Sequence, residues 1–214
     1  MTNTPHSSRN HESNASWPPS RAAYREISSY CALSKPKLEA LKPWLDNHAA
    51  RFEEPRYVEN DPIGVVVGYE EAVDREIVAF LAAMMAWGRR EIVIQKTLLL
   101  MENLGPHPAL TLRETSEEQW MQWFASFRHR TFNVIDIVAF LRGLKVLLQQ
   151  GETLETIWKE CFDAVQQDPV CLMSEFQRRF RAAAEPFPKR TSRHISTPES
   201  KTASKRLWMY LRWM

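Results

Sequence analysis

The residue whose position could support covalent chemistry is Lys205, near the start of a C-terminal helix that we expect to open between Pro198 and Thr202. Lys201 lies one turn earlier and Arg206 is adjacent. Nearby cations and the positive end of a helix dipole both disfavour the protonated amine. An amine that gives up its proton can act as a nucleophile. The alternative is an ordinary solvated or phosphate-binding lysine, which the spacing alone favours.

Two short cationic segments could contact nucleic acid. Arg89 and Arg90 stand at a bend between two expected helices, where their side chains could reach a phosphate or a displaced base. The segment 127–132 mixes cations with aromatic residues in an expected loop between two helices. In both places the alternative is a solvated charge that keeps a helix end or an apolar loop soluble. The candidate nucleic-acid-binding residues are Arg89, Arg90, Arg128, Arg130, Lys201 and Arg206.

The distribution of charge also bears on the choice of partner. The net charge is only +2, but ten basic residues from Arg178 onward face only Glu185 and Glu199, so this segment carries a formal charge of about +8. The earlier part of the chain is correspondingly acidic. Such a basic segment suits a phosphate-rich partner such as DNA.

Several classes of function are excluded by absent motifs. The six histidines are scattered without an HExxH pattern, and the three cysteines lack CxxC spacing, so we expect no metal site and no disulfide framework. With six glycines and no GxGxxG, Walker A or GxSxG motif, the chain predicts no nucleotide cofactor and no hydrolase elbow. No run of eighteen apolar residues and no signal peptide occur, so we expect a cytoplasmic protein without a membrane partner.

The elements that must position these residues are predicted to be helices. One helix with a single buried stripe ends at Trp87-Gly88, because glycine can adopt the left-handed conformation that closes a helix. A second helix follows at once and stops before Gly105, so the two form an αα-hairpin. The apolar stripes consist of Ile77, Phe80, Leu81, Met84 and Met85, and of Ile92, Leu98, Leu99 and Met101.

Capping residues predict where other helices begin. Ser34 starts a helix that Pro43 should kink or stop early, and Ser116 forms a capping box with Gln119. Asn133 caps a helix that ends at Gly151, and a further helix covers about residues 153–167. The next predicted helix begins at Asp168-Pro169 and runs to about Ala184. The only strand-like segment is Val65-Val66-Val67.

These signals predict an all-α protein, a multi-helix orthogonal array. Residues 1–20 have almost nothing to bury and are expected to be a disordered leader, while residues 34–214 form a single helical domain with a basic loop at 185–199. Leu207, Leu211 and Met214 share one face of the last helix, with no polar tail after them. We therefore expect the chain to be truncated at its C-terminus. The alternative is that this helix packs on the preceding ones and simply ends.

Four segments resemble an uncharacterised bacterial family of conserved hypothetical proteins, over roughly residues 36–214. They are Asp61-Pro62-Ile63, residues 74–83 running into Ala86-Trp87-Gly88-Arg89-Arg90, residues 127–132 and residues 205–214. That family is similar in turn to the helix-hairpin-helix DNA glycosylase superfamily, most closely to its archaeal 8-oxoguanine glycosylase branch.

The resemblance implies a fold, a partner and a reaction. In that superfamily the duplex is held by its phosphates, the damaged nucleotide is flipped out, and an amine or water attacks the sugar carbon. The partner implied is damaged or abasic duplex DNA, and Lys205 falls where the Schiff-base lysine would stand. The aspartate that assists this lysine, in a Pro-x-Asp-x-His segment, has no counterpart before Met214. The resemblance therefore implies a scaffold with half of a catalytic site, inactive by itself.

Two other functions stay open. The chain could be a non-catalytic helical module whose basic C-terminal segment contacts nucleic acid. It could also be an adapter that docks a protein partner on the face of Leu207, Leu211 and Met214.

Overall fold

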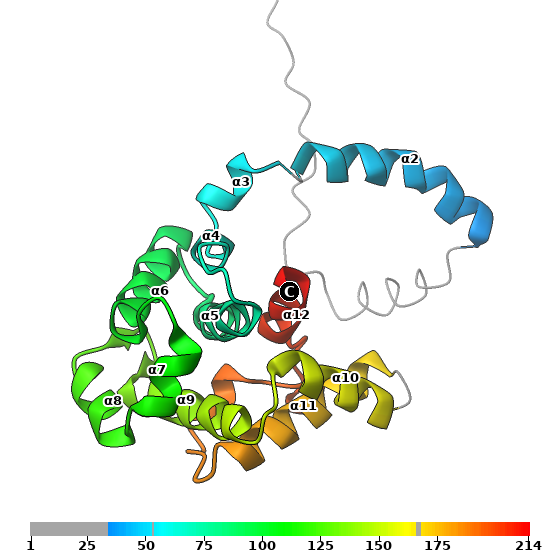
Figure 1. Cartoon of the computed structure of the whole chain (residues 1–214). Helices are drawn as coiled ribbons and strands as arrows, with labels where there is room; N and C mark the ends of the chain where they lie inside the picture. The colour runs from blue at the N-terminus through cyan, green and yellow to red at the C-terminus, as the bar shows by residue number, and fades with distance from the viewer. Residues whose placement is uncertain (1–33, 53, 166–167) are drawn as a thin grey trace, which may run out of the picture. The chain divides into compact units, whose positions relative to one another are not determined.

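The computed structural model describes residues 34–52, 54–165 and 168–214 (Figure 1). The predicted leader, residues 1–20, lies outside the described residues. The chain divides into two compact units, residues 1–53 and 54–214. The described part of the first unit is helix α2 (Lys35–Phe52), which begins directly after Ser34 and continues through Pro43 for nine more residues. The predicted start is confirmed, and the early stop is wrong.

The described part of the second unit is helical except for one two-stranded antiparallel sheet, which confirms the all-α class. Val65-Val66-Val67 is not a strand but the end of a short helix and its C-cap. The elements are α3 (Arg56–Glu59), α4 (Ile63–Val66), α5 (Ala72–Met85), α6 (Arg90–Leu104), α7 (Pro108–Glu114), α8 (Glu117–Trp123), β1 (Arg128–His129), β2 (Phe132–Asn133), α9 (Val134–Gln149), α10 (Leu154–Ala164), α11 (Pro169–Ala183), the 3-10 turns η1 (Thr191–His194) and η2 (Pro198–Ser200), and α12 (Lys205–Trp213).

Helix α5 is the centre of the second unit and packs against α4, α6, α7, α10 and α12 (Figure 1). Every side chain from Ile77 to Met85 is at most 1 % exposed. This part of the helix is therefore buried all round, whereas the sequence predicted one buried stripe. The reason is its composition, since Val78, Ala79, Ala82 and Ala83 fill the positions between the predicted stripe residues.

Two buried carboxylates on α5 fix the starts of neighbouring helices. Asp74 accepts a hydrogen bond of 2.7 Å from the backbone N–H of Ala109 in α7. Glu76 accepts one of 2.8 Å from the backbone N–H of Leu154, the first residue of α10. The first N–H groups of a helix have no partner within the helix, so these side chains satisfy donors that would otherwise be buried unpaired. Burial raises the pKa of Glu76 above its ordinary value, even though the bonds at α10 lower it.

The face that α6 buries agrees only in part with the predicted one, since Met101 is buried as predicted. Leu98 and Leu99 are 48 % and 39 % exposed, whereas Val93, Thr97 and Leu100 are buried. A polar residue takes a core position here because the Thr97 hydroxyl donates to the backbone carbonyl of Val93, at 2.9 Å. A threonine whose hydroxyl is hydrogen-bonded to the backbone can occupy a buried position on a helix where a hydropathy pattern would predict leucine.

The predicted capping residues are confirmed. Ser116 and Gln119 exchange both hydrogen bonds of a capping box at α8. Asn133 accepts from the N–H of Ile135 at α9, at 3.1 Å. Asp168 accepts from the N–H of Cys171 at α11, also at 3.1 Å.

Helix α12 begins later than predicted. Residues 198–200 form the separate turn η2, and Lys201 and Ser204 have φ of +56° and +48°, which interrupts any helix between them. Leu207 is 1 % exposed and Leu211 packs partly buried on the core, so the C-terminal face is largely covered by the fold. Leu207 is therefore not part of an exposed adapter face, whereas Met214 is 50 % exposed. None of the helices in the described ranges is long and apolar enough to cross a membrane.

Helices α9 and α11 approach each other closely at Gly143. A Cβ on Gly143 would lie 2.9 Å from the ring of Phe180 and 3.0 Å from the Cβ of Ala184. The Phe180 ring is buried among Phe80, Phe140 and Phe176, with centroid distances of 4.9 to 6.1 Å, so it has little freedom to move.

We predict that Gly143→Ala lowers the free energy of unfolding by about 1–2 kcal/mol, because overpacking outweighs the gain in helix propensity. Urea denaturation followed by circular dichroism measures the change. Gly68→Ala is the matched control, since a Cβ there meets only the carbonyl oxygen of Val65 at an ordinary 3.5 Å. A Gly143→Ala protein as stable as Gly68→Ala would contradict the close contact.

Candidate functional site

Four segments that are distant in the sequence meet at the indole of Trp87, in the turn between α5 and α6. His194 of η1 stacks on this ring, with centroids 5.3 Å apart and planes inclined by 19°. The Arg206 guanidinium of α12 lies 4.5 Å from the ring centroid. His129 and Phe132 of the β1–β2 hairpin contact the ring at 4.7 and 6.2 Å. We call these five residues the Trp87 cluster.

Arg206 is a desolvated cation. Its Nη1 donates to the carbonyl oxygens of Met84, at 3.2 Å, and His194, at 2.9 Å. Burial lowers the pKa of Arg206. No carboxylate lies within ion-pair distance of it in the described part of the chain. The partial negative charge at the C-terminal end of α5 stabilises the guanidinium in part, and its remaining N–H donors stay available.

The carboxylate of Asp136 holds η1 against the cluster. It has no exposed surface and accepts hydrogen bonds from the Thr191 hydroxyl, at 2.8 Å, and from the N–H of Asn133, at 3.0 Å. Arg190 Nη2 lies 3.2 Å from Oδ2, and His194 Nε2 lies 3.7 Å from it. One side chain in α9 therefore binds Arg190 and Thr191 of the basic C-terminal segment and lies close to His194.

The interactions of Asp136 favour its ionised form. Burial by itself raises the pKa of Asp136, but the interactions with His194, Thr191 and the N–H of Asn133 outweigh it, and the net pKa lies below the ordinary value. The charge on this buried group is thus stabilised by specific partners.

The β1–β2 hairpin is bound to the same place by two arginines. Arg190 Nη2 also donates to the carbonyl oxygen of Thr131, at 2.7 Å. Arg130, at φ +56°, lays its side chain against the α5–α6 turn, where a Cβ on Gly88 would lie 3.5 Å from its Nη1. Glycine suits this position because its φ is +103°.

Three exposed arginines therefore surround the turn at Trp87. Arg89 is the N-cap residue of α6, Arg90 is its first residue, and Arg130 comes from the hairpin. We call these three residues the cationic rim. Arg90 lies 3.7 Å from the carboxylate of Asp61, whereas Arg89 and Arg130 have no carboxylate partner among the described residues.

The other predicted residues are placed differently. Lys205 is exposed as the first residue of α12, next to Arg206, and its amine has no hydrogen-bond or ion-pair partner in residues 34–52, 54–165 and 168–214. Ser204 provides no side-chain cap for α12, so the first N–H groups of this helix lack one. Arg128 and Lys201 are exposed, and neither has a hydrogen bond or ion pair to the Trp87 cluster within the described ranges.

The residues that organise the site are not among those that the sequence predicted. His129 and His194 were treated as isolated histidines, yet they are 3 % and 1 % exposed and both contact Trp87. Asp136 had a usable signal, because an acid three residues after the cap residue Asn133 is typical of a capping box. Nothing local connected that acid to η1, 55 residues later.

The arrangement can bind anions. No group of three His, Cys, Asp or Glu side chains in the described ranges is placed to hold a metal ion. The Trp87 cluster and the cationic rim instead present guanidinium groups, and two of those at the surface have no carboxylate partner among the described residues. Guanidinium groups bind phosphate and carboxylate oxygens in bidentate geometry.

The fold and the site thus define a helical protein that gathers cationic side chains around one tryptophan. The chain belongs to the family described as protein of unknown function DUF2400, which matches residues 61–214. The predicted membership of an uncharacterised family is confirmed, although the match begins at Asp61 instead of near residue 36. Searches among curated proteins and solved structures found no match.

We predict that Asp136→Asn lowers the free energy of unfolding by about 3 kcal/mol at pH 7, because it removes the charge that Arg190 and Thr191 are bound to. Since folding lowers the pKa of Asp136, its stabilisation is complete above the pKa of an unfolded aspartate, about 4, and is lost as the pH falls through the folded value. Urea denaturation at several pH values measures both effects.

The matched control is Asp46→Asn, which removes an exposed carboxylate that pairs with Lys42. This change should alter stability by less than about 1 kcal/mol. A deficit in Asp136→Asn that stays constant between neutral and strongly acidic pH would show that the ionised carboxylate does not hold η1.

Proposed function

We propose that the protein binds duplex DNA at the cationic rim, and that Lys205 is the amine of a DNA glycosylase/lyase-type reaction on damaged or abasic sites. The observation that carries this proposal is the convergence of Arg89, Arg130 and Arg206 at the α5–α6 turn without carboxylate partners among the described residues. A protein interior or surface normally neutralises such clustered charge, and a bound polyanion would do so here.

Backbone phosphates are the part of DNA that this geometry fits. Arg89 and Arg90 begin α6, so a phosphate near them also meets the positive end of a fifteen-residue helix. Arg130 reaches the same turn from the hairpin. Three contacts from two elements would fix the orientation of a duplex without reading its sequence.

The position of Lys205 supports a chemical step beside the bound phosphates. Lys205 immediately precedes Arg206, whose guanidinium lies at the Trp87 ring, and its amine has no partner among the described side chains. An abasic site in its open form carries an aldehyde. The lysine nitrogen would add to that carbon, a C=N bond would form and water would leave. We also propose that the helical array resembles the helix-hairpin-helix DNA glycosylase fold.

A non-catalytic nucleic-acid-binding module is the second candidate. The observation that favours it is the exposure of Lys205, since no carboxylate of the described residues lies within ion-pair distance to assist it. The module would use the same cationic rim, so the two candidates differ only in the covalent step.

For binding, we predict that Arg89→Ala combined with Arg130→Ala weakens duplex affinity and reduces the slope of log affinity against log salt by about 2, because each lost phosphate contact contributes about 0.9. Fluorescence anisotropy at several salt concentrations measures the slope. Lys159→Ala is the control, since Lys159 is an exposed cation on α10 paired with Glu155. An unchanged slope in the double variant would place the DNA elsewhere.

For chemistry, we predict that borohydride traps a covalent adduct between the wild-type protein and abasic-site DNA, because imine formation needs only the lysine amine, even though turnover would also need the assisting aspartate. Lys205→Arg should abolish the adduct while keeping the salt slope. Arginine preserves the positive charge but does not form the imine. Lys159→Arg should trap like the wild type. Equal trapping by Lys205→Arg would remove the role of this lysine, and DNA binding without any adduct in the wild type would favour the non-catalytic module.

A further inference from the structure

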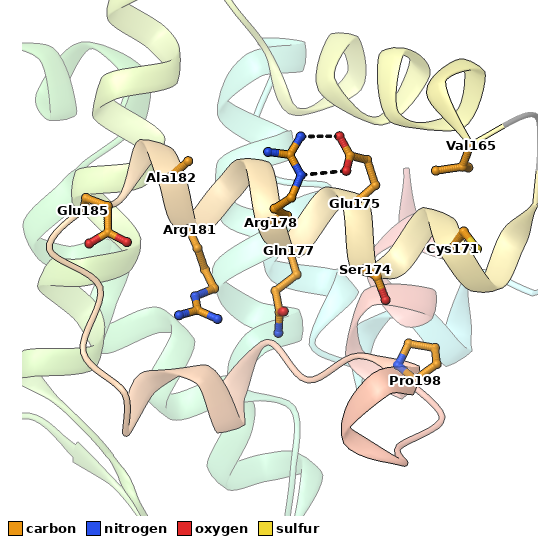
Figure 2. A pocket seen from close by; sticks show the side chains of 10 residues that line it. All are labelled: Val165, Cys171, Ser174, Glu175, Gln177, Arg178, Arg181, Ala182, Glu185 and Pro198. Atoms are coloured by element: carbon orange, nitrogen blue, oxygen red, sulfur yellow. Dashed lines mark hydrogen bonds and ion pairs between the residues drawn. The ribbon is translucent and has the colours of Figure 1, made fainter.

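A groove of about 800 Å³ lies along α11, facing the segment that carries Pro198 (Figure 2). Its lining includes neither the residues of the Trp87 cluster nor those of the cationic rim. The volume falls in the range of small-molecule binding sites. The proposed DNA-binding function leaves this groove unexplained.

Arg181 is the unusual side chain in this groove. Its guanidinium carbon lies 5.5 Å from the ring centroid of Phe187, and its Nε is buried without a hydrogen-bond partner in the part of the chain that the structure describes. The neighbouring Arg178 and Arg179 are both bonded to Glu175, at 2.6 to 2.9 Å. A buried N–H without an acceptor is destabilising, and such groups point to an unseen ligand, ion or water.

Two further polar side chains share the face of Arg181. Ser174, Gln177 and Arg181 are spaced i, i+3 and i+7, and Figure 2 shows all three on the Pro198 side of α11, with Arg178 on the opposite side. Gln177 Nε2 donates to the carbonyl oxygen of Ile195, which leaves its Oε1 as an acceptor. The row from Ser174 to Arg181 is about 10 Å long at 1.5 Å per residue.

Among the residues whose side chains the structure describes, the two carboxylates that line the groove are engaged elsewhere. The Glu175 carboxylate is bonded to Arg178 and Arg179, and these bonds lower its pKa to about 2. Glu185 Oε2 accepts from the N–H of Phe187, at 3.1 Å. Neither forms an ion pair with Arg181, so this guanidinium has no carboxylate partner among the described residues.

We propose that this groove binds an oxyanion, carboxylate or phosphate, through Arg181, with the body of the ligand extending along Gln177 toward Ser174. The planar guanidinium, held over the Phe187 ring, offers the bidentate geometry that such a head group requires. Hydroxyl or amino groups of the body would bond to Gln177 Oε1 and the Ser174 hydroxyl. The oxyanion is either the acid group of a small organic molecule or a backbone phosphate of a polynucleotide.

The test is a titration of the ¹⁵N-labelled protein with inorganic phosphate and with acetate at constant ionic strength, following the Nε–Hε signals of the arginines by NMR. We expect a saturable shift of the Arg181 signal with at least one anion, and an affinity about tenfold or more lower in Arg181→Gln. Arg178→Gln is the matched control, because Arg178 lines the same groove but is bound to Glu175. It should retain the binding.

Two further variants test the role of the guanidinium and separate this site from the proposed DNA site. Arg181→Lys preserves the charge and lacks the planar fork, so it should bind more weakly than the wild type even if Arg181→Gln does not fold. Arg89→Ala with Arg130→Ala should leave the titration unchanged, which separates this site from the proposed DNA site. Displacement of phosphate by a DNA duplex would assign the head group to a polynucleotide, and no displacement would assign it to a small acid. The absence of a saturable shift with both anions, or equal binding by Arg181→Gln, would overturn the proposal.

Discussion

The site at Trp87 depends on one buried carboxylate. Asp136 has no exposed surface, and its two oxygens serve the N-terminus of α9 and the segment that includes Thr191 and His194 at the same time. A buried charge is tolerated only when its partners are in place, so this group requires η1 to dock where it does. The docking then brings His194 onto Trp87 and leads the chain back to α12, where Arg206 completes the cluster.

In the second unit the buried acids have hydrogen-bond partners, whereas some of the arginines have no carboxylate partner among the described residues. These buried acids each accept a hydrogen bond from a backbone N–H group at a helix start. Asp74 and Glu76 thereby connect α5 to α7 and α10, whereas Asp136 caps its own helix and connects it to η1 through Thr191. The cations at the α5–α6 turn and in the α11 groove are less well matched, because Arg181 and Arg206 have no carboxylate partner in the described residues. This lack of carboxylate partners is the physical basis for proposing anionic ligands at both places.

The basic C-terminal segment therefore serves several purposes. Arg178 and Arg179 are neutralised by Glu175 on α11, and Arg190 is bound within the fold. A count of charges along the sequence overestimates how much of this segment is available to a polyanion. Part of the candidate DNA-binding surface lies outside this segment, because the residues of the cationic rim come from the α5–α6 turn and the hairpin, earlier in the chain.

The sequence by itself determined the helical class and most helix boundaries, because caps such as Asn133 and breakers such as Gly88 act within a few residues. It failed at α12, where Lys201 and Ser204 adopt left-handed conformations that usually require glycine, so no local signal marked the interruption. The site was decided by tertiary structure. Trp87 meets residues from more than 100 positions later in the chain, and such contacts depend on how whole helices pack, which local periodicity does not encode.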